Sequence, residues 1–340
     1  MHCKLPCAVL LCAALLTGCA AQPAKMVEAA SVPPPEVLVV YTSHPQEVYE
    51  PLIAEFEQRT GIWVDVVTGG TQELLDKIAD PETVPAADVL FGGGVESLAA
   101  AEEQFLPYVS LQTAALRADV PTAADGAWSP FSSSPLVLIY NTKLVGARYA
   151  PTSWASLRGS RWTGRIAFAD PALSGSCYTA LETVSQLYGT EYLADLAANL
   201  DGQLLASSGK VLARVADGSF SVGVALESTV RQQMADGADL NYVYPRDGTT
   251  VLPDGMAIIA GTAHMQSARL FIDCMLGADV QTYLARQLGR DPVRAGIAPV
   301  ERTLKAQWMT DYSLTRGTED KAALLADWQA LCTAAWEGAV

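Results

Sequence analysis

The feature of this sequence that most limits its fold is a repeated succession of an apolar run, a small polar or glycine-rich turn, and a helical pattern. Apolar runs at 36–41, 62–67 and 87–91 each end in such a turn, after which apolar residues recur at helical spacing. This repetition predicts a parallel α/β sheet with helical crossovers. In open sheets of this kind, ligands bind beyond the carboxyl ends of the strands, where these turns gather.

Two interruptions of the pattern indicate a second lobe. A serine- and proline-rich stretch at 128–135 precedes a new apolar run at 136–140, and 245–255 is rich in turn residues. We interpret these stretches as crossings between two α/β lobes whose strand-end turns face a common cleft. Further strands are expected at 165–169, 203–206, 220–226 and 256–259. The predicted boundaries are 36–130 with 246–290 for lobe 1, 131–245 for lobe 2, and 291–340 for C-terminal helices that pack on the lobes.

One turn of the second lobe, Ser174-Gly175-Ser176, is suited to hold an anion. It follows the expected strand at 165–169 and precedes a helical pattern that extends to Tyr188. The first turn of a helix has backbone N–H groups without intrahelical partners and carries partial positive charge. Gly175 would allow a ligand to approach the backbone, and the two serines add hydroxyl donors. The alternative is that one serine is only a helix cap.

The amino terminus has the pattern of a secretion signal. Lys4 precedes an apolar run at 8–16 that is too short for a membrane-spanning helix, which needs roughly 20 residues. The following Leu-Thr-Gly-Cys resembles the lipobox of bacterial lipoproteins, which implies a signal peptide at 1–18 and lipid attachment at Cys19. The proline-containing segment 19–35 would be an extended tether. We therefore expect a body in the periplasm or at the cell surface that meets a membrane only through its lipid.

Composition and charge exclude some partners. The chain has 340 residues, 50% of them hydrophobic, which is enough for a large core. A net charge of −15 argues against nucleic acid and anionic lipid as partners of the body. Beyond Cys19, the sequence contains Cys177, Cys274 and Cys332, so at most one disulfide can form. Their spacing is not that of a metal site, and no metal or other cofactor is expected.

Several motifs resemble those of a known family. They are VLVVY at 37–41 followed by Ser43-His44-Pro45, FEQRTGIWVDVVTGGTQELL at 56–75, IYNTK at 139–143, GRIAFADPALSGS at 164–176, ADG at 216–218 and PDG at 253–255. Together they resemble the extracellular solute-binding proteins of ABC importers, in the branch with ferric-iron, phosphonate and hexose-phosphate binding proteins. The resemblance implies a type II periplasmic-binding-protein fold, an α/β fold whose two lobes close on a small ligand. It also implies ABC permease and ATPase subunits as partners, and we expect a monomer.

The ligand is expected to be a small anion with a phosphate or phosphonate group. Ferric-binding members hold iron with adjacent tyrosines after the strand that here ends at Glu227, and residues 226–230 contain no tyrosine. A phosphate group needs several N–H and hydroxyl donors, which the strand-end turns supply. As the resemblance implies, Glu227 would accept bonds from sugar hydroxyls or an amine. His44 is itself expected to donate to the phosphate if it is partly protonated. The predicted ligand-binding residues are Ser43, His44, Gly70, Thr71, Gly93, Ser174, Gly175, Ser176, Ser208 and Glu227.

Other interpretations stay open at this point. Alternative functions are a ferric-iron-binding protein and a solute sensor that does not transport. An extracellular hydrolase would need Ser176 or Cys177 as nucleophile and His44 or His264 as base, but the Gly-x-Ser-x-Gly elbow is absent from the sequence. We expect no enzymatic activity. Structural roles also compete with binding, because Ser207-Ser208 would otherwise be a helix cap and His44 would otherwise cap or pack against the first helix.

Overall fold

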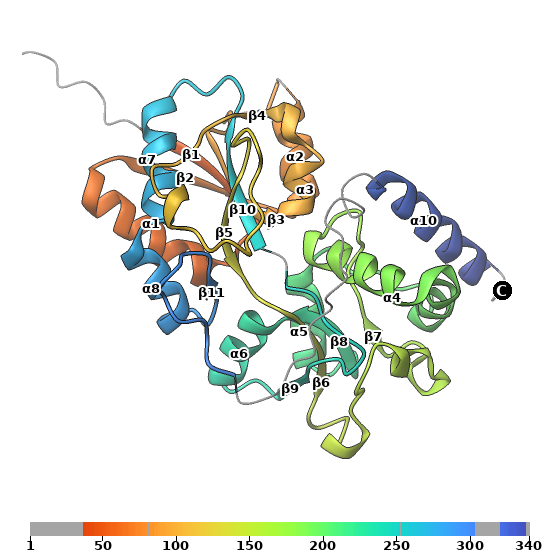
Figure 1. The fold of residues 1–340 in the computed structure, drawn as a ribbon. Helices are drawn as coiled ribbons and strands as arrows, with labels where there is room; N and C mark the ends of the chain where they lie inside the picture. Colours follow the sequence, from red (N-terminus) through yellow and green to blue (C-terminus); the bar gives the residue numbers. More distant parts are fainter. Residues whose placement is uncertain (1–36, 81, 84, 252, 303–319, 338–340) are drawn as a thin grey trace, which may run out of the picture. The chain divides into compact units, whose positions relative to one another are not determined.

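The computed structural model describes the chain at residues 37–80, 82–83, 85–251, 253–302 and 320–337. These residues form two β-sheets with helices packed on them (Figure 1). The predicted signal peptide, the lipid-attachment residue Cys19 and the predicted tether lie outside the described residues. No helix in the described ranges is long and apolar enough to cross a membrane.

The first sheet has the strand order β11-β5-β10-β3-β1-β2, with β4 beside β10. Its strands are β1 (Val37–Thr42), β2 (Trp63–Thr68), β3 (Val89–Gly94), β4 (Phe105–Leu106), β5 (Ser129–Ser133), β10 (Pro253–Ile259) and β11 (Asp291–Pro292). As predicted, β1 is parallel to β2 and β3, but β10 is antiparallel to β3 and β5. The sheet is therefore mixed and not wholly parallel. The chain re-enters the first sheet from the second lobe, so β10 starts beside the end of β3, with Asp254 opposite Gly94. It therefore runs antiparallel to β3.

Helices on both faces of the first sheet complete what we call the first lobe. They are α1 (Gln46–Thr60), α2 (Thr71–Ala79), α3 (Val95–Ala99), α7 (Met265–Met275) and α8 (Ala278–Gln287). Alternate residues of a strand face opposite sides. Accordingly, Val89 and Phe91 join the core formed with α1, α7 and α8, while Leu90 joins the core formed with α2 and α3. Because both of their faces are buried, the central strands β1 and β3 contain continuous apolar runs.

The second sheet has the order β7-β8-β6-β9 and forms the centre of the second lobe. Its strands are β6 (Leu136–Asn141), β7 (Ile166–Ala167), β8 (Val222–Leu226) and β9 (Leu240–Val243), and its helices are α4 (Gly175–Leu200), α5 (Ser208–Ala216), α6 (Glu227–Ala235) and α10 (Lys321–Glu337). α4 is broken at Gly189, where φ is 70°, so the helical pattern predicted up to Tyr188 ends there and a second segment follows. The expected strand at 203–206 is wrong, because in the described chain Leu205 makes only an isolated bridge to Ala169.

The chain crosses from the first lobe to the second at 134–135 and returns between β9 and β10. The prediction that 128–135 is a crossing is wrong for Ser129–Ser133, which forms β5 inside the first sheet. This strand resembles a loop in sequence because it is polar, but its three serines are buried, and the Ser132 side chain is hydrogen-bonded. Ser132 Oγ, for example, donates to Asp254 Oδ1 at 2.9 Å. Long-range hydrogen bonds therefore stabilise a strand that local patterns do not predict.

The C-terminal part of the chain contacts both lobes. β11 pairs with β5 in the first sheet, whereas α10 lies beside α4 on the second lobe (Figure 1). Trp328 and Cys332 of α10 are buried in the second-lobe core, and Trp336 Nε1 donates to Ala197 O at 2.9 Å. Short 3₁₀ helices in the described chain lie at Glu102–Gln104, Thr113–Ala115, Ala147–Tyr149, Ala155–Arg158 and Ser160–Trp162.

Candidate functional site

A cavity of about 620 Å³ has walls from both lobes. The first lobe contributes the starts of α1 and α2, the end of β3, the start of β10 and the side chain of Arg290. The second lobe contributes the starts of α4, α5 and α6. The predicted site residues that line the cavity are Ser43, His44, Gly70, Thr71, Gly93, Ser174, Gly175, Ser176 and Ser208. Turns that are far apart in the sequence are thus brought together around one space.

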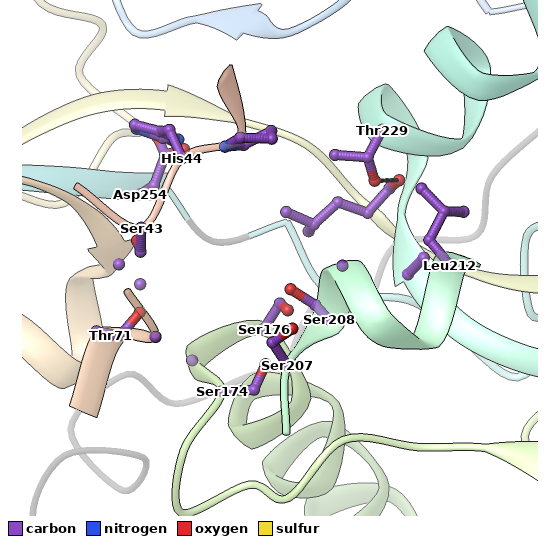
Figure 2. A pocket seen from close by; sticks show the side chains of 18 of the residues that line it. Ser43, His44, Thr71, Ser174, Ser176, Ser207, Ser208, Leu212, Thr229 and Asp254 are labelled. Carbon is purple, nitrogen blue, oxygen red and sulfur yellow. Dashed lines mark hydrogen bonds and ion pairs between the residues drawn. The ribbon is translucent and has the colours of Figure 1, made fainter. Parts of the chain in front are cut away.

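Several helices begin at this cavity without a side-chain cap. Ser174 is the N-cap of α4 but makes no side-chain cap hydrogen bond, and the same holds for Pro45 at the start of α1. The first-turn N–H groups of any helix have no intrahelical partner, and in α4 the Ser174 side chain does not bond to them either. Figure 2 shows Ser174 and Ser176 at this turn, with Ser207 and Ser208 at the start of α5 beside them. Backbone N–H groups and hydroxyls gathered in this way can stabilise an anion.

The start of α5 separates a structural serine from a cavity-lining one. Ser207 is the N-cap, and its Oγ accepts from Lys210 N at 3.3 Å, so the cap interpretation holds for Ser207. Ser208 is the first residue of the helix and also lines the cavity. Lys210 lines the cavity too, and sequence reasoning missed it. The sequence did contain a signal for Lys210, because a lysine two residues after a serine turn at a helix start adds positive charge to the same group of donors.

The predicted site glycines lie where the two lobes approach each other. A Cβ atom on Gly70, in the first lobe, would lie 2.9 Å from Leu173 O in the second. A Cβ atom on Gly175 would lie 3.2 Å from Thr71 Oγ1 of the first lobe. Gly93 has a φ of 91°, and a Cβ atom there would lie 2.6 Å from Thr71 Cγ2. Gly70 and Gly175 therefore let the lobes come close, whereas Gly93 lets α2 pack closely against β3 within the first lobe.

His44 is buried, with 7% of its surface exposed, and its ring packs against Phe91 and Phe131. Burial lowers the pKa of the imidazole to about 4, although the Asp254 carboxylate favours the charged form. The ring is therefore neutral at neutral pH, and the predicted donation from a partly protonated His44 is wrong. Its Nε2 atom lies 3.8 Å from Asp254 Oδ2.

The low pKa of His44 predicts a loss of stability in acid. The pKa is 6.5 for an ordinary histidine and about 4 here, so the unfolded chain takes up this proton first as the pH falls. The free energy of unfolding is unaffected by this group above about pH 6.5 and drops by about 2–3 kcal/mol on reaching pH 4.5. Urea unfolding at pH 7 and pH 4.5 should show a smaller acid loss in His44→Phe than in the unchanged chain. Equal losses would contradict the assigned pKa.

Asp254 and Arg290 form a buried ion pair in the cavity wall that sequence reasoning missed. The Arg290 guanidinium donates to Asp254 Oδ2 and, through Nε, to Ser132 Oγ at 2.7 Å. Asp254 Oδ1 accepts from the backbone N and the Oγ of Ser132, both at 2.9 Å. The motif at 253–255 entered the sequence analysis only as part of a resemblance. Its partner arginine lies 36 residues further along the chain, so no local pattern joins them.

Glu227 is a predicted site residue that does not line the cavity. Its side chain is 0% exposed, and its carboxylate accepts from Arg302 Nε at 2.8 Å and from the Tyr244 hydroxyl at 2.6 Å. The predicted role as an acceptor for sugar hydroxyls or an amine is therefore wrong. Arg302 also pairs with Asp291 of β11, so Glu227 instead helps to join the second lobe to the C-terminal part of the first.

Of the residues considered for hydrolysis, Ser176 and His44 line the cavity, on different lobes, whereas Cys177 and His264 do not. Cys177 is 1% exposed, and burial raises the pKa of its thiol to about 11, which keeps it protonated at neutral pH. His264 lies outside the cavity lining, with Nδ1 3.0 Å from Asp88 Oδ2. Cys177, Cys274 and Cys332 are free thiols. In the part of the chain that the structure describes, no group of three or more His, Cys, Asp or Glu side chains could hold a metal ion.

Comparison with known proteins agrees with this architecture. Residues 77–310 match the family described as bacterial extracellular solute-binding protein. A relative in Salmonella typhimurium, named "Putative 2-aminoethylphosphonate-binding periplasmic protein", is 25% identical over 268 residues, which are 76% of this chain and 77% of the relative.

Two solved structures share the fold. One is the periplasmic binding protein AfuA of Actinobacillus pleuropneumoniae, solved with fructose-6-phosphate bound, with a TM-score of 0.80, 24% identity, and coverage of 88% of this chain and 99% of that one. The other is iron-bound HitA of Pseudomonas aeruginosa, with a TM-score of 0.72, 20% identity, and coverage of 87% and 99%. The predicted type II periplasmic-binding-protein fold is confirmed. The chain belongs to the bacterial extracellular solute-binding proteins, which are periplasmic or extracellular and work with the permease and ATPase components of ABC transporters.

Proposed function

We propose that this protein binds a small phosphorylated or phosphonate solute by closure of its two lobes and delivers it to an ABC importer. The observation that carries the proposal is the uncapped N-terminus of α4, which meets the hydroxyls of Ser174, Ser176 and Ser208 in one cavity. A phosphorus oxyanion accepts several hydrogen bonds at once, and helix N-termini supply N–H donors together with partial positive charge. Closure would bring these donors around the anion from both lobes.

The charges around the cavity are compatible with an anionic ligand in spite of the net charge of −15. Lys210 is part of the same wall as the serines. Three carboxylates line the cavity as well: Asp254, which is paired with Arg290, Glu73, which is paired with Lys77, and Glu47. Exposed charges more than about 8 Å from the ligand are largely screened at physiological salt. The groups that line the cavity therefore decide whether an anion is attracted.

Relatives support a ligand that contains phosphorus. The Salmonella relative is named for 2-aminoethylphosphonate, and AfuA was solved with fructose-6-phosphate. Each of these molecules joins a phosphorus oxyanion to a second polar group. A cavity with many hydroxyl and N–H donors suits the shared oxyanion, whatever the second group is.

Ferric iron is the second candidate, because HitA of similar fold was solved with iron. A trivalent cation needs several anionic oxygen ligands. Of the three carboxylates that line the cavity, Asp254 is already paired with Arg290 and Glu73 with Lys77, and the third is Glu47. Among the described residues, no group of three or more His, Cys, Asp or Glu side chains lies close enough to hold a metal ion. We therefore favour the phosphorus oxyanion.

We further propose that a lipid on Cys19 tethers the body to a membrane and that the protein acts as a monomer in transport, not as a sensor. The lipobox-like Leu16-Thr17-Gly18-Cys19 supports the lipid. Mass spectrometry of the mature N-terminus tests it, because an unmodified Cys19 would contradict the tether.

A thermal-unfolding panel on the purified full chain tests the ligand class. The panel contains hexose phosphates, 2-aminoethylphosphonate, inorganic phosphate, free sugars and ferric citrate. A ligand at a hundred times its dissociation constant stabilises the folded state by about 2.7 kcal/mol, which raises the midpoint by about 5 °C. We expect a shift with a phosphorylated or phosphonate compound but not with its parent that lacks phosphorus. A shift with ferric citrate alone would replace this proposal with iron binding.

A further inference from the structure

The carboxylate of Asp254 keeps one acceptor position unused. An ionised carboxylate offers about four lone-pair positions on its two oxygens. Oδ1 accepts two hydrogen bonds from Ser132, through the backbone N and Oγ, both at 2.9 Å. Oδ2 accepts from the Arg290 guanidinium. Counted over the described residues, Oδ2 has room for one further donor, and Asp254 lines the cavity.

His44 places a second unsatisfied atom beside this oxygen. His44 Nε2 is buried and has no hydrogen-bond partner among the residues that the structure describes. It lies 3.8 Å from Asp254 Oδ2, which is too far for a direct hydrogen bond. Buried polar atoms in native proteins nearly always have a partner, so an orphan atom in a ligand cavity needs an explanation. A neutral imidazole nitrogen donates or accepts according to its tautomer.

We propose that Asp254 Oδ2 and His44 Nε2 form a subsite for a hydrogen-bond donor at the far end of the ligand, an ammonium or a hydroxyl group. The inference rests on the proposed function and narrows its substrate class to phosphates or phosphonates that also carry an N–H or O–H donor. One nitrogen or oxygen atom placed between Oδ2 and Nε2 can donate to the carboxylate and bond to the imidazole. It satisfies both atoms at once.

The subsite lies apart from the serine cluster, which fixes how the ligand is oriented. Figure 2 shows His44 and Asp254 together in the first lobe, and Ser174, Ser176 and Ser208 gathered in the second. A carboxylate repels a phosphate, so the phosphorus group lies at the serines and the donor lies at Asp254. A ligand that carries a phosphorus group and a hydrogen-bond donor therefore contacts both lobes, and both contacts stabilise the closed arrangement of the lobes.

Calorimetric titration of the purified full chain tests the subsite with three ligands that differ only at the far end. They are 2-aminoethylphosphonate, 2-hydroxyethylphosphonate and ethylphosphonate. We expect ethylphosphonate to bind at least about tenfold more weakly than the better of the other two, because it leaves both acceptor atoms unsatisfied. If 2-aminoethylphosphonate binds more tightly than 2-hydroxyethylphosphonate, the subsite prefers an ammonium group; the reverse order indicates a hydroxyl group. Equal affinities for all three would overturn the subsite and leave the proposed function standing. If neither these ligands nor inorganic phosphate nor the hexose phosphates of the thermal panel bind, both proposals are overturned.

The variant His44→Phe tests whether His44 recognises the ligand's donor group or only packs in the first-lobe core. It removes Nε2 but keeps a ring against Phe91 and Phe131. We expect the affinity for the preferred ligand to fall about tenfold, while that for ethylphosphonate stays the same. His264→Phe is the matched control, because His264 belongs to the first lobe but not to the cavity lining, and it should keep the preference. An equal loss for all three ligands in His44→Phe would show a merely structural role and overturn the subsite.

Discussion

Replacing Ser176 by aspartate is expected to abolish binding of phosphorylated solutes while the chain stays folded. Ser176 is the second residue of α4 and lines the cavity where the phosphorus group is proposed to lie. A carboxylate about 4 Å from one unit of phosphate charge costs about 4 kcal/mol at an effective dielectric constant of 20, which is about a thousandfold in affinity. Folding should survive, because this position is partly exposed and an acidic residue in the first turn favours a helix. Calorimetry gives the affinity, and thermal unfolding gives the stability.

Ser176→Asn is the matched control for this prediction. Asparagine has the size of aspartate without its charge, so we expect it to weaken binding by less than about tenfold. A large loss in both variants would indicate a steric effect and not charge repulsion. If Ser176→Asp binds as tightly as the unchanged chain, the N-terminus of α4 is not part of the phosphate site.

The parts of the fold that the sequence predicts are those governed by local patterns. β1 and β3 are predicted within a few residues, because a continuous apolar run ended by a polar turn is typical of a strand buried on both faces. β2 is also predicted within a few residues, although it is an edge strand without a buried residue. β5 is missed, since its residues Ser129–Ser133 are stabilised by distant partners such as Asp254. The direction of β10 is also missed. It depends on which lobe the chain comes from, which no local pattern encodes.

The candidate site divides in the same way. The serine turns of α4 and α5 both line one cavity. The rule that strand-end turns gather at one edge applies to the turn before α4, which follows β7, but in the described chain the turn before α5 follows no strand. The same rule fails for Glu227, because a place at the end of β8 does not tell which way a side chain points. Here the carboxylate turns to Tyr244 and Arg302 and away from the cavity. Position along the chain therefore predicts which turns meet but not which side chains face the ligand.

Electrostatic properties were the least predictable from sequence. His44 is correctly placed at the cavity, but its proton affinity depends on burial between Phe91 and Phe131, which come from different strands. Likewise, the charge of Asp254 is offset by Arg290, a residue distant in sequence. Desolvation and ion pairing are properties of the assembled fold, and they decide which groups are charged.

Replacing Gly70 by alanine is expected to weaken ligand binding because it hinders closure of the lobes. The added Cβ atom would lie 2.9 Å from Leu173 O, a backbone atom of the other lobe that cannot rotate away. Overpacking of this kind costs about 1–3 kcal/mol, which corresponds to roughly five- to 150-fold in affinity. The first lobe itself should fold normally, because Gly70 has φ −69° and ψ 152°, values that alanine adopts freely.

Gly146→Ala is the matched control for Gly70→Ala. Gly146 has a similar backbone, with φ −65° and ψ 145°, but a Cβ atom there would meet nothing closer than Tyr149 Cδ2 at 3.8 Å. The two variants make the same chemical change and differ in whether the other lobe is in the way. Calorimetry should show weaker binding in Gly70→Ala alone, and X-ray scattering should show that saturating ligand compacts it less. If both variants bind equally tightly, the ligand-bound lobes do not approach as closely as they do here, and one lobe alone would have to hold the phosphate.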